Sequence, residues 1–484
     1  MDPVELRAVV PVSACRGVLP DRVPEAWRPR FHVTAERNWI NDPNGPIRHK
    51  GIFHLFFQAN PDAPSWGRPV WGHVTSTDLV TWTRQPLALS PEPGAPDADG
   101  CWSGCTRIVQ GRPTIYYTGV VGEDDGRVES VCRAWGSADL LAWERDAANP
   151  LVPGPPAQLS NGYHRDPFLW HDDGGWHMLL GGGTAGKGRH GQVLRYDSPD
   201  ATAWTYRGVF YSAPRWIGAL DAGEHWECPQ LVLEGDAAAL IVSCQAPGEH
   251  RPLLYSVAFT GALRDGRFDG ELDGKLDYGD VFYAAALFRE DSGRTLLWGW
   301  AQERLHPDRQ ATLSHAGALS LPRDVHLEDG RLRTHPIPEL QMLRRGVLDQ
   351  DARDGSIALS AQSELAATFA GSGRGGWRLI DRDGIARVLI EIDLRRHCLR
   401  VAVTDGNATA HPLMAPLQPR GSHAVRVFID GSLIEAVADD ERFVTTRAYP
   451  EAGAWSRAQL IADPDVRADL VGAWALTPDA VGPG

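Results

Sequence analysis

The feature that most constrains the fold is an internal repeat of about sixty residues. The pattern S-x-D-x-x-x-W begins at Ser76, Ser137 and Ser198, and its aspartates, at positions 78, 139 and 200, are 61 residues apart twice. Self-similarity at such a period is typical of folds in which one small supersecondary unit recurs. The repeat therefore predicts several equivalent units rather than one irregular core.

A second series of segments runs in phase with this pattern and predicts what each unit contains. Five runs rich in aromatic and aliphatic residues are typical of buried strands. They are GIFHLFFQA from Gly51, GRPTIYYTG from Gly111, GGWHMLLGG from Gly174, AAALIVSCQ from Ala237 and GRTLLWGWA from Gly293. Turn residues separate short strands throughout, and no long segment has a 3.6-residue period. Five small antiparallel sheets arranged radially predict a five-bladed β-propeller over residues 30 to 338.

The sequence pattern changes after RTHPIPEL, whose two prolines are typical of a linker. From about residue 345, alternating strands such as RVLIEIDL and AVRVFIDGSLIEAVAD continue without the sixty-residue period. Strands at this density predict a β-sandwich over residues 345 to 484. With an N-terminal extension over residues 1 to 29, the prediction is an all-β chain of two domains, as 484 residues suggest.

Composition excludes several classes of partner. A formal charge of -14 argues against nucleic acid and against an anionic membrane surface. The N-terminus lacks the basic region of a signal peptide, and no apolar run is long enough to span a membrane. Seven scattered cysteines favour a reducing, cytoplasmic compartment. We interpret Cys101 and Cys105 as buried thiols, and predict no metal site and no cofactor, because neither Cys nor His shows paired ligand spacing.

Each aromatic run is preceded by an acidic residue. These acids are Asp42, Asp99, Asp166, Glu227 and Asp280. Equivalent positions in equivalent blades are related by the propeller axis, so the side chains are expected to converge at one mouth of the central channel. Converging carboxylates repel one another and are costly to desolvate, so a chain that keeps them is expected to use them.

The alternative interpretation is that each acid caps its own turn. Asp42-Pro43-Asn44-Gly45 has the composition of a tight turn, and we expect a turn there. For Asp99 and Asp280 capping is the preferred interpretation. The other three acids follow Asn41, Arg165 and Trp226, which supply donors and an aromatic wall.

Paired carboxylates beside aromatic side chains are typical of sites that hydrolyse glycosides. Eighteen tryptophans fit the stacking of sugars, although Trp82, Trp143 and Trp204 recur with the repeat and are predicted to be core residues. The substrate predicted on these grounds is a small carbohydrate.

Several motifs, in order along the chain, resemble glycoside hydrolase family 32, the β-fructofuranosidases. The central ones are WINDPNGP from Trp39, RDP from Arg165 and EC from Glu227. Others are FQANP from Phe57, CWSG from Cys101, DYGDVFYAA from Asp277, WGW from Trp298, GALSLPRDV from Gly317 and IDGSLIEAVADD from Ile429. Together they are highly specific and span most of the chain.

The resemblance implies a five-bladed propeller with a C-terminal sandwich, and retaining hydrolysis of terminal β-fructofuranosides. Carried over by motif, Asp42 is the nucleophile, Glu227 the general acid/base and Asp166 the stabiliser of the transition state. The same carry-over assigns the fructosyl subsite to Asn41, Gln58, Trp66, Trp102, Ser103, Arg165 and Trp300. Cys105 and Gln230 depart from the family pattern near the site and leave the choice of substrate open.

This chemistry requires Asp42 to be ionised and Glu227 to be protonated, a state that the charges of the other two acids favour. Asp166, paired with Arg165, is expected to stay ionised. Retention predicts that the carboxyl groups of Asp42 and Glu227 lie roughly 5 to 5.5 Å apart.

The leading interpretation is a cytoplasmic exo-acting β-fructofuranosidase that cleaves sucrose or short fructo-oligosaccharides, as a monomer or a homodimer. Fructosyl transfer, exohydrolysis of inulin or levan, and hydrolysis of another furanoside are alternatives. A sugar-binding propeller without catalysis is a further one, disfavoured because all three acids are present. The sequence leaves open whether a phosphorylated sucrose is the substrate.

Overall fold

Strands make up almost all regular structure in the computed structural model, which describes residues 25–123, 126–156, 163–184, 188–247, 252–404, 411–450, 454–476 and 481–482. The helical elements in these ranges are one α-helix and two 3-10 helices: α1 (Pro307–Gln310), η1 (Glu25–Trp27) and η3 (Pro338–Leu343). The prediction of an all-β chain is confirmed. None of the helices in the described part of the chain has the length and apolar composition to cross a bilayer.

Residues 38 to 336, here called the five-sheet region, form five antiparallel sheets in sequence order. The first sheet contains β1 (Asn38–His49), β2 (Ile52–Asn60), β3 (Val70–Ser76) and β4 (Trp82–Leu89). The second contains β5 (Gly100–Val109), β6 (Arg112–Val121), β7 (Val128–Gly136) and β8 (Trp143–Arg145). The third contains β9 (Arg165–Asp172), β10 (Gly175–Gly183), β11 (Gly191–Ser198) and β12 (Thr205–Ser212).

The fourth sheet contains β15 (His225–Glu234), β16 (Ala237–Gln245), β17 (Leu253–Arg264) and β18 (Arg267–Lys275). The fifth contains β19 (Phe282–Arg289), β20 (Thr295–Ala301), β23 (Arg323–Glu328) and β24 (Arg331–Pro336), with β22 (Ala318–Leu319) paired to β20. A short hairpin of β13 (Trp216–Ile217) and β14 (Leu220–Asp221) lies between the third and fourth sheets. Two distant strands join the first sheet in parallel: β21 (His315–Ala316) on β1 and β37 (Val481–Gly482) on β4.

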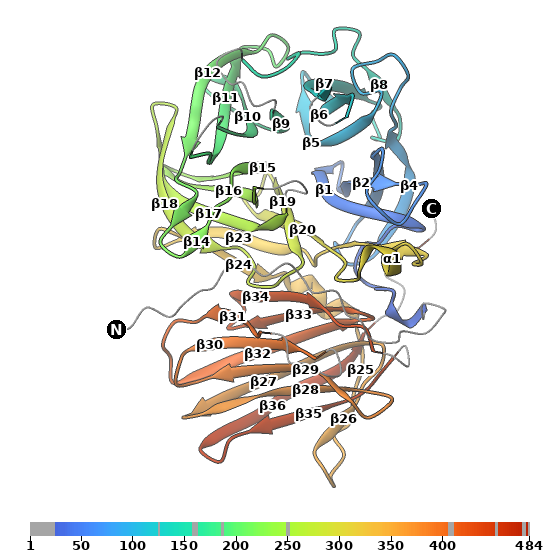
Figure 1. Cartoon of the computed structure of the whole chain (residues 1–484), viewed down its shortest axis with the longest axis vertical. Coiled ribbons are helices and arrows are strands. Elements are labelled where there is room, and N and C mark those ends of the chain that lie inside the picture. Colours follow the sequence, from blue (N-terminus) through green and yellow to red (C-terminus); the bar gives the residue numbers. More distant parts are fainter. Residues whose placement is uncertain are drawn as a thin grey trace.

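The first strands of the five sheets contact one another in a closed cycle, in the order β1, β5, β9, β15, β19 and back to β1. Figure 1 shows these strands gathered at the centre of the five-sheet region. The five aromatic runs of the sequence are the second strands, β2, β6, β10, β16 and β20, so they are buried strands as predicted. The S-x-D-x-x-x-W segments connect the third strand to the fourth in three of the sheets, and each aspartate accepts backbone N–H groups of its own turn.

Every first strand carries an irregularity in its first half, where its register with the second strand shifts. The shifts lie between Ile40 and Pro43, Trp102 and Gly104, Arg165 and Phe168, Glu227 and Gln230, and Tyr283 and Ala286. Extra residues at such bulges redirect side chains out of the regular alternation. Three bulge residues, Asp166, Cys228 and Ala284, have positive φ angles of 64°, 48° and 51°. The five bulges therefore form a ring at one end of the first strands.

The prediction of a tight turn at Asp42-Pro43-Asn44-Gly45 was wrong. These residues lie inside strand β1, where Pro43 and Asn44 pair with Phe57 and Phe56 of β2. Proline is tolerated because it lies at a bulge of β1, beyond the two residues, Asn38 and Trp39, that pair with β21. Gly45, with φ 43°, lies against Thr106, and a Cβ there would come within 2.8 Å of the Thr106 backbone N. The residues of this segment, which are typical of a tight turn, therefore form a β-bulge.

Residues 344 to 476, here called the two-sheet region, form two six-stranded sheets. One contains β25 (Arg344–Val347), β36 (Val466–Leu476), β27 (Gln362–Gly371), β32 (Ser422–Asp430), β33 (Leu433–Ala438) and β34 (Arg442–Arg447). The other contains β26 (Ser356–Ala358), β35 (Trp455–Ala462), β28 (Arg374–Asp381), β29 (Ala386–Asp393), β30 (Cys398–Val403) and β31 (Leu413–Pro416).

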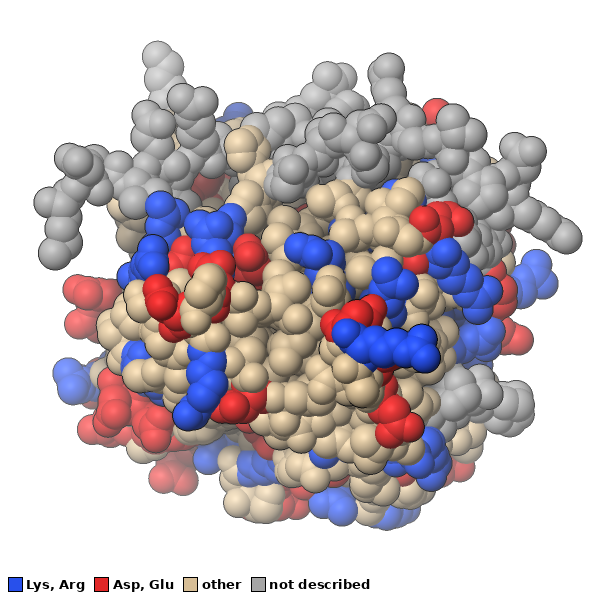
Figure 2. Space-filling view, turned by 90° about the horizontal axis from the view of Figure 1, so that it is seen from below, with Lys and Arg blue, Asp and Glu red and all other residues tan. Residues whose placement is uncertain are grey.

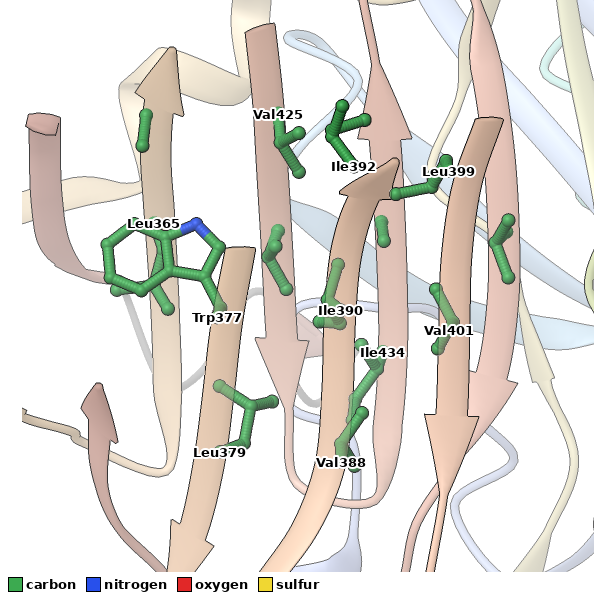
Figure 3. Packing of buried hydrophobic residues seen from close by; sticks show 14 of the residues in the cluster. Leu365, Trp377, Leu379, Val388, Ile390, Ile392, Leu399, Val401, Val425 and Ile434 are labelled. Atoms are coloured by element: carbon green, nitrogen blue, oxygen red, sulfur yellow. The ribbon is translucent and has the colours of Figure 1, made fainter. Parts of the chain in front are cut away.

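The two six-stranded sheets pack against each other through one apolar core. Figure 3 shows Leu365, Val425 and Ile434 of one sheet facing Trp377 and Ile390 of the other, and all of these side chains are buried. Alternate residues along each strand point inward, as the pleat of a sheet requires. At the lower end of the molecule, seen from below in Figure 2, basic and acidic side chains are interspersed.

Buried charged groups join the two regions. The Asp430 carboxylate accepts the backbone N–H groups of Arg30 at 2.7 Å, Phe31 at 2.8 Å and His32 at 3.0 Å. Nearby, the fully buried Arg323 guanidinium of β23 pairs with Glu435 of β33 at 3.1 Å. These contacts tie the segment before the five-sheet region, and the fifth sheet of that region, to the two-sheet region.

Candidate active site

Asp42 is held by side chains from two neighbouring sheets. It lies at the bulge of β1, and its Oδ2 accepts hydrogen bonds from Ser103 Oγ at 2.7 Å and from Gln58 Nε2 at 3.4 Å. Asn41 Nδ2 donates to its Oδ1 at 3.1 Å. Gln58 also donates to Ser103 Oγ. The predicted residues Asn41, Gln58 and Ser103 therefore do meet at Asp42.

Asp166 lies at the bulge of β9 and is almost fully buried. Its backbone N–H donates to Thr118 Oγ1 at 2.8 Å, and its Oδ2 accepts the backbone N–H of Cys228 at 2.9 Å. The Cys228 thiol lies 3.6 Å from Asp166 Oδ2 and 3.6 Å from Asp42 Oδ2. One cysteine from β15 thus bridges two acids from β1 and β9.

Glu227 directly precedes this cysteine, and two side chains bind its carboxylate. Tyr283 Oη donates to Glu227 Oε2 at 2.7 Å, and Arg165 Nη2 lies 2.9 Å from Glu227 Oε1. Arg165 also pairs with the buried Glu129 at 2.8 Å. Although burial alone would lower the pKa of Arg165, its carboxylate partners, Glu129 foremost, outweigh burial and raise it.

The expectation that Arg165 pairs with Asp166 was wrong. At the bulge of β9 the two side chains have different partners: the Arg165 guanidinium pairs with Glu129 and Glu227, while Asp166 accepts the backbone N–H of Cys228. Burial and then the neighbouring Glu227 raise the pKa of Asp166. This opposes the predicted ionised state of Asp166 before any substrate is present.

Asp42 is affected by the same cluster. Burial is the largest cause that raises the pKa of Asp42, to about 6, and the Glu227 carboxylate adds to it. The hydrogen bond from Ser103 acts in the opposite direction and favours the ionised form. Asp42 and Asp166 therefore both retain a proton at a higher pH than an ordinary aspartate does.

Four tryptophans surround the acids. Trp300 is buried and packs edge-on against Trp39 at 5.4 Å, and the Trp39 indole donates to Asn41 at 3.1 Å. Trp66 is 51% exposed and lies 5.6 Å from Trp102, which stacks with the guanidinium of Arg165. The exposed Trp66 and the buried Trp300 therefore offer one aromatic face at the rim and one in the interior.

Sequence reasoning missed several residues that complete the site. Glu129, Thr118, Tyr283 and Cys228 contact the three acids or Arg165 directly. Tyr283 and Cys228 lie in the motifs DYGDVFYAA and EC, so the sequence does carry a signal for their position near the acids. Glu129, in the third strand of its sheet, carries no local signal, since only the fold brings it to Arg165.

The two acids interpreted as structural have structural partners. Asp99 accepts the backbone N–H of Gly122 at 2.7 Å. Asp280 accepts a hydrogen bond from Thr446 of the two-sheet region at 2.8 Å and pairs with Arg304. Among the described residues, no group of three or more His, Cys, Asp or Glu side chains has an arrangement that could hold a metal ion.

The two departures from the family pattern have local explanations. Cys105 is buried in an apolar cluster with Tyr116 and Leu169. Gln230 donates to the backbone carbonyl of Pro229 at 2.9 Å and accepts the backbone N–H of Leu287 at 2.9 Å. Both side chains are therefore committed to packing between strands.

The chain is similar to known proteins along most of its length. Residues 32–336 match the family model described as Glycosyl hydrolases family 32 N-terminal domain. Raffinose invertase of Escherichia coli is 33% identical over 496 residues, which cover 97% of this chain and 98% of that protein. Sucrose-6-phosphate hydrolase of Bacillus subtilis (strain 168) is 29% identical over 471 residues, covering 93% and 94%.

A solved structure has the same arrangement. The GH32 beta-fructofuranosidase of Bombyx mori superposes with a TM-score of 0.80 at 26% identity, covering 95% of this chain and 96% of that one. The similarity thus includes the two-sheet region as well as the five-sheet region.

Proposed function

The chain belongs to glycoside hydrolase family 32, and on that premise we propose that it is a retaining hydrolase that releases terminal β-D-fructofuranosyl residues from sucrose and short fructo-oligosaccharides. The proposal extends to architecture: the five-sheet region is a five-bladed β-propeller over residues 30 to 338, and the domain predicted over residues 345 to 484 is a β-sandwich whose last strand is β36. The closed cycle of first strands supports the propeller. The last described strand, β37, pairs with β4 and so extends the C-terminal segment onto the propeller.

One observation carries the functional proposal. Acids from three different sheets meet at bulges, and the Cys228 thiol lies 3.6 Å from both Asp42 and Asp166. Burying such a cluster without using it costs free energy, since like charges and desolvation both oppose it. Binding alone requires no such cluster, whereas a double-displacement reaction requires a nucleophilic carboxylate and a second carboxyl group beside it.

In the proposed mechanism, Asp42 attacks the anomeric C2 of the fructosyl unit and forms a covalent ester. Glu227, oriented by Tyr283 and Arg165, gives a proton to the departing glycosidic oxygen. Water then attacks C2 with Glu227 as the base, the bond between C2 and Asp42 breaks, and fructose leaves with its configuration retained. The predicted separation of the two carboxyl groups is roughly 5 to 5.5 Å, as in retaining enzymes.

Asp166 is proposed to bind ring hydroxyl groups more tightly as positive charge develops on the sugar. Its raised pKa means that it holds a proton in the free enzyme over part of the pH range, and a sugar hydroxyl that donates to it favours the ionised form. Asn41, Gln58, Ser103 and Trp300 are proposed to line the fructosyl subsite. Trp66 and Trp102 are proposed to form its rim, and Arg165 its charged wall.

The test is a comparison of initial rates on sucrose, sucrose 6-phosphate, kestose, inulin and levan. We expect kcat/KM to be highest for sucrose or kestose and lower for the polymers. Oligofructosides in excess of free fructose at high sucrose concentration would identify a fructosyltransferase instead. Activity only on nitrophenyl derivatives of another furanoside, or calorimetric binding of fructan without turnover, would contradict the proposal.

The acid limb of the pH profile gives a second prediction. Because Asp42 must be ionised to attack, and its pKa is raised to about 6, kcat/KM should fall as the pH decreases through about 6. Ser103→Ala removes a hydrogen bond that lowers this pKa, so the limb should move to higher pH, by about one unit for a bond to a charged group. If the acid limb of the kcat/KM profile does not move in Ser103→Ala, the ionisation of Asp42 does not control that limb.

A further inference from the structure

The central channel has a second cavity at the end opposite the three acids. Its volume is about 930 Å³, and it is lined by the later residues of all five first strands, from Ile47, Thr106, Phe168, Leu231 and Leu287 onward. Ser103 and Thr106, the first lining residue of β5, are three residues apart, so at about 3.3 Å per residue the cavity begins about 10 Å from the active site along this strand. Nothing in the proposed hydrolysis uses it.

The charge of this cavity is opposite to that of the whole chain. Its lining includes four cationic side chains, Arg48, Lys50, Arg107 and Arg289, and two acids, Glu290 and Asp291. The excess is two positive charges in a chain whose formal charge is -14. Arg48 is neutralised by Glu290, with which it pairs at 2.9 Å.

Two arginines of the lining have no carboxylate partner within the described residues. Arg107 donates through Nε to the Leu169 carbonyl at 2.6 Å and through Nη1 to the Thr106 carbonyl at 2.8 Å. Arg289 donates to the Leu233 carbonyl. Burial lowers the pKa of Arg107, and its guanidinium lies 4.9 Å from the centroid of the Phe168 ring. A cation that is removed from water without a counter-ion is costly, and an anion in the cavity would offset that cost.

The rest of the lining indicates what the anion carries. Phe168, Leu169, Leu231 and Leu287 give the cavity apolar walls, and the volume far exceeds that of a single inorganic ion. A phosphate monoester carries a charge of about −2 near neutral pH and binds paired guanidinium groups well.

We propose that this cavity binds a small organic phosphate, with its phosphate group between Arg107 and Arg289 and its organic body against the apolar walls. The proposal goes beyond the hydrolytic site and does not depend on it. Its ligand is a class, a phosphate monoester with a sugar-sized or slightly larger body.

The test is calorimetric titration of the full chain at low ionic strength with glucose 6-phosphate, AMP, inorganic phosphate and glucose. We expect at least one ester to bind with a Kd below about 1 mM, and both inorganic phosphate and glucose to bind more weakly. Arg107→Gln and Arg289→Gln should each weaken binding about tenfold or more, since each removes a charged donor. Arg378→Gln, at an exposed position of β28 in the two-sheet region, is the matched control and should change nothing.

The variants also separate this cavity from the active site. Arg289 is exposed, so Arg289→Gln should fold normally and hydrolyse sucrose at the wild-type rate while losing the phosphate ester. If the affinity persists in both arginine variants, the ester binds elsewhere and the proposal fails. If neither ester binds, the proposal fails as well. If inorganic phosphate binds as tightly as the esters, the ligand needs no organic part, and the proposed class of ligand is wrong.

Discussion

Asp42→Ala should lower kcat for sucrose by about four orders of magnitude or more while the protein stays folded, because the variant cannot form the covalent intermediate. Glu227→Ala should have an effect of similar size, since the leaving oxygen then departs without a proton. Steady-state rates, with circular dichroism to establish folding, measure both. Because the two carboxyl groups act as one unit, the double variant should be little worse than the more damaged single variant.

Asp99→Asn provides the matched control for these substitutions. Asp99 precedes its aromatic strand as Asp42 does, but its carboxylate accepts a backbone N–H in a loop. Asp99→Asn should keep kcat within a few-fold of wild type. Near wild-type hydrolysis of sucrose by Asp42→Ala would refute the assignment of the nucleophile, whatever the control shows.

Arg323→Met should destabilise the protein by about 3 to 5 kcal/mol, because removing one partner of a buried ion network leaves the others uncompensated. The Arg323 guanidinium is fully buried and lies 2.7 Å from Asp277, 3.1 Å from Glu435 and 3.1 Å from the Thr445 hydroxyl. It also lies 3.8 Å above the ring of Phe443. Urea unfolding, with a shift of the midpoint at unchanged slope, measures the loss.

Arg467→Ala is the control for Arg323→Met. Arg467 pairs with Asp469 at 2.8 Å, but the two side chains are 76% and 53% exposed. Exposed pairs contribute little, so the free energy of unfolding should change by less than about 0.5 kcal/mol. Equal effects of the two substitutions would show that the buried network does not hold the two regions together.

The repeat explains why so much of the fold could be predicted from the sequence. Aromatic runs such as Gly51 to Ala59 are apolar at nearly every position because the second strand of a sheet is covered on both faces. The phase of the repeat then placed Asp42, Asp166 and Glu227 at equivalent heights, and the structure brings Asp42 and Asp166 to a common thiol. Periodicity carries this information because equivalent residues of equivalent sheets face the same axis.

The remainder depends on contacts between residues that are far apart in sequence. The bulge at Asp42 has the composition of a turn, and only its pairing with β2 shows that the strand continues. Arg165 was predicted to pair with its neighbour Asp166, although its guanidinium pairs with Glu129 and Glu227, which lie 36 and 62 residues away in sequence. Glu129 itself has no pattern around it. Local composition therefore indicated candidate site residues more readily than the contacts between them.

The carboxylate of Asp430 also constrains when the chain can fold. It binds the backbone of Phe31 across 399 positions of sequence, and β21 and β37 complete the first sheet from comparably distant segments. A ribosome that has released only the first sheet has synthesised none of these partners. Long-range closure of this kind slows folding and leaves strand edges exposed in the meantime. The first sheet to be translated is thus among the last to be completed. A chain truncated before residue 430 would lack both Asp430 and β37, so the contacts that complete its earliest strands would be missing.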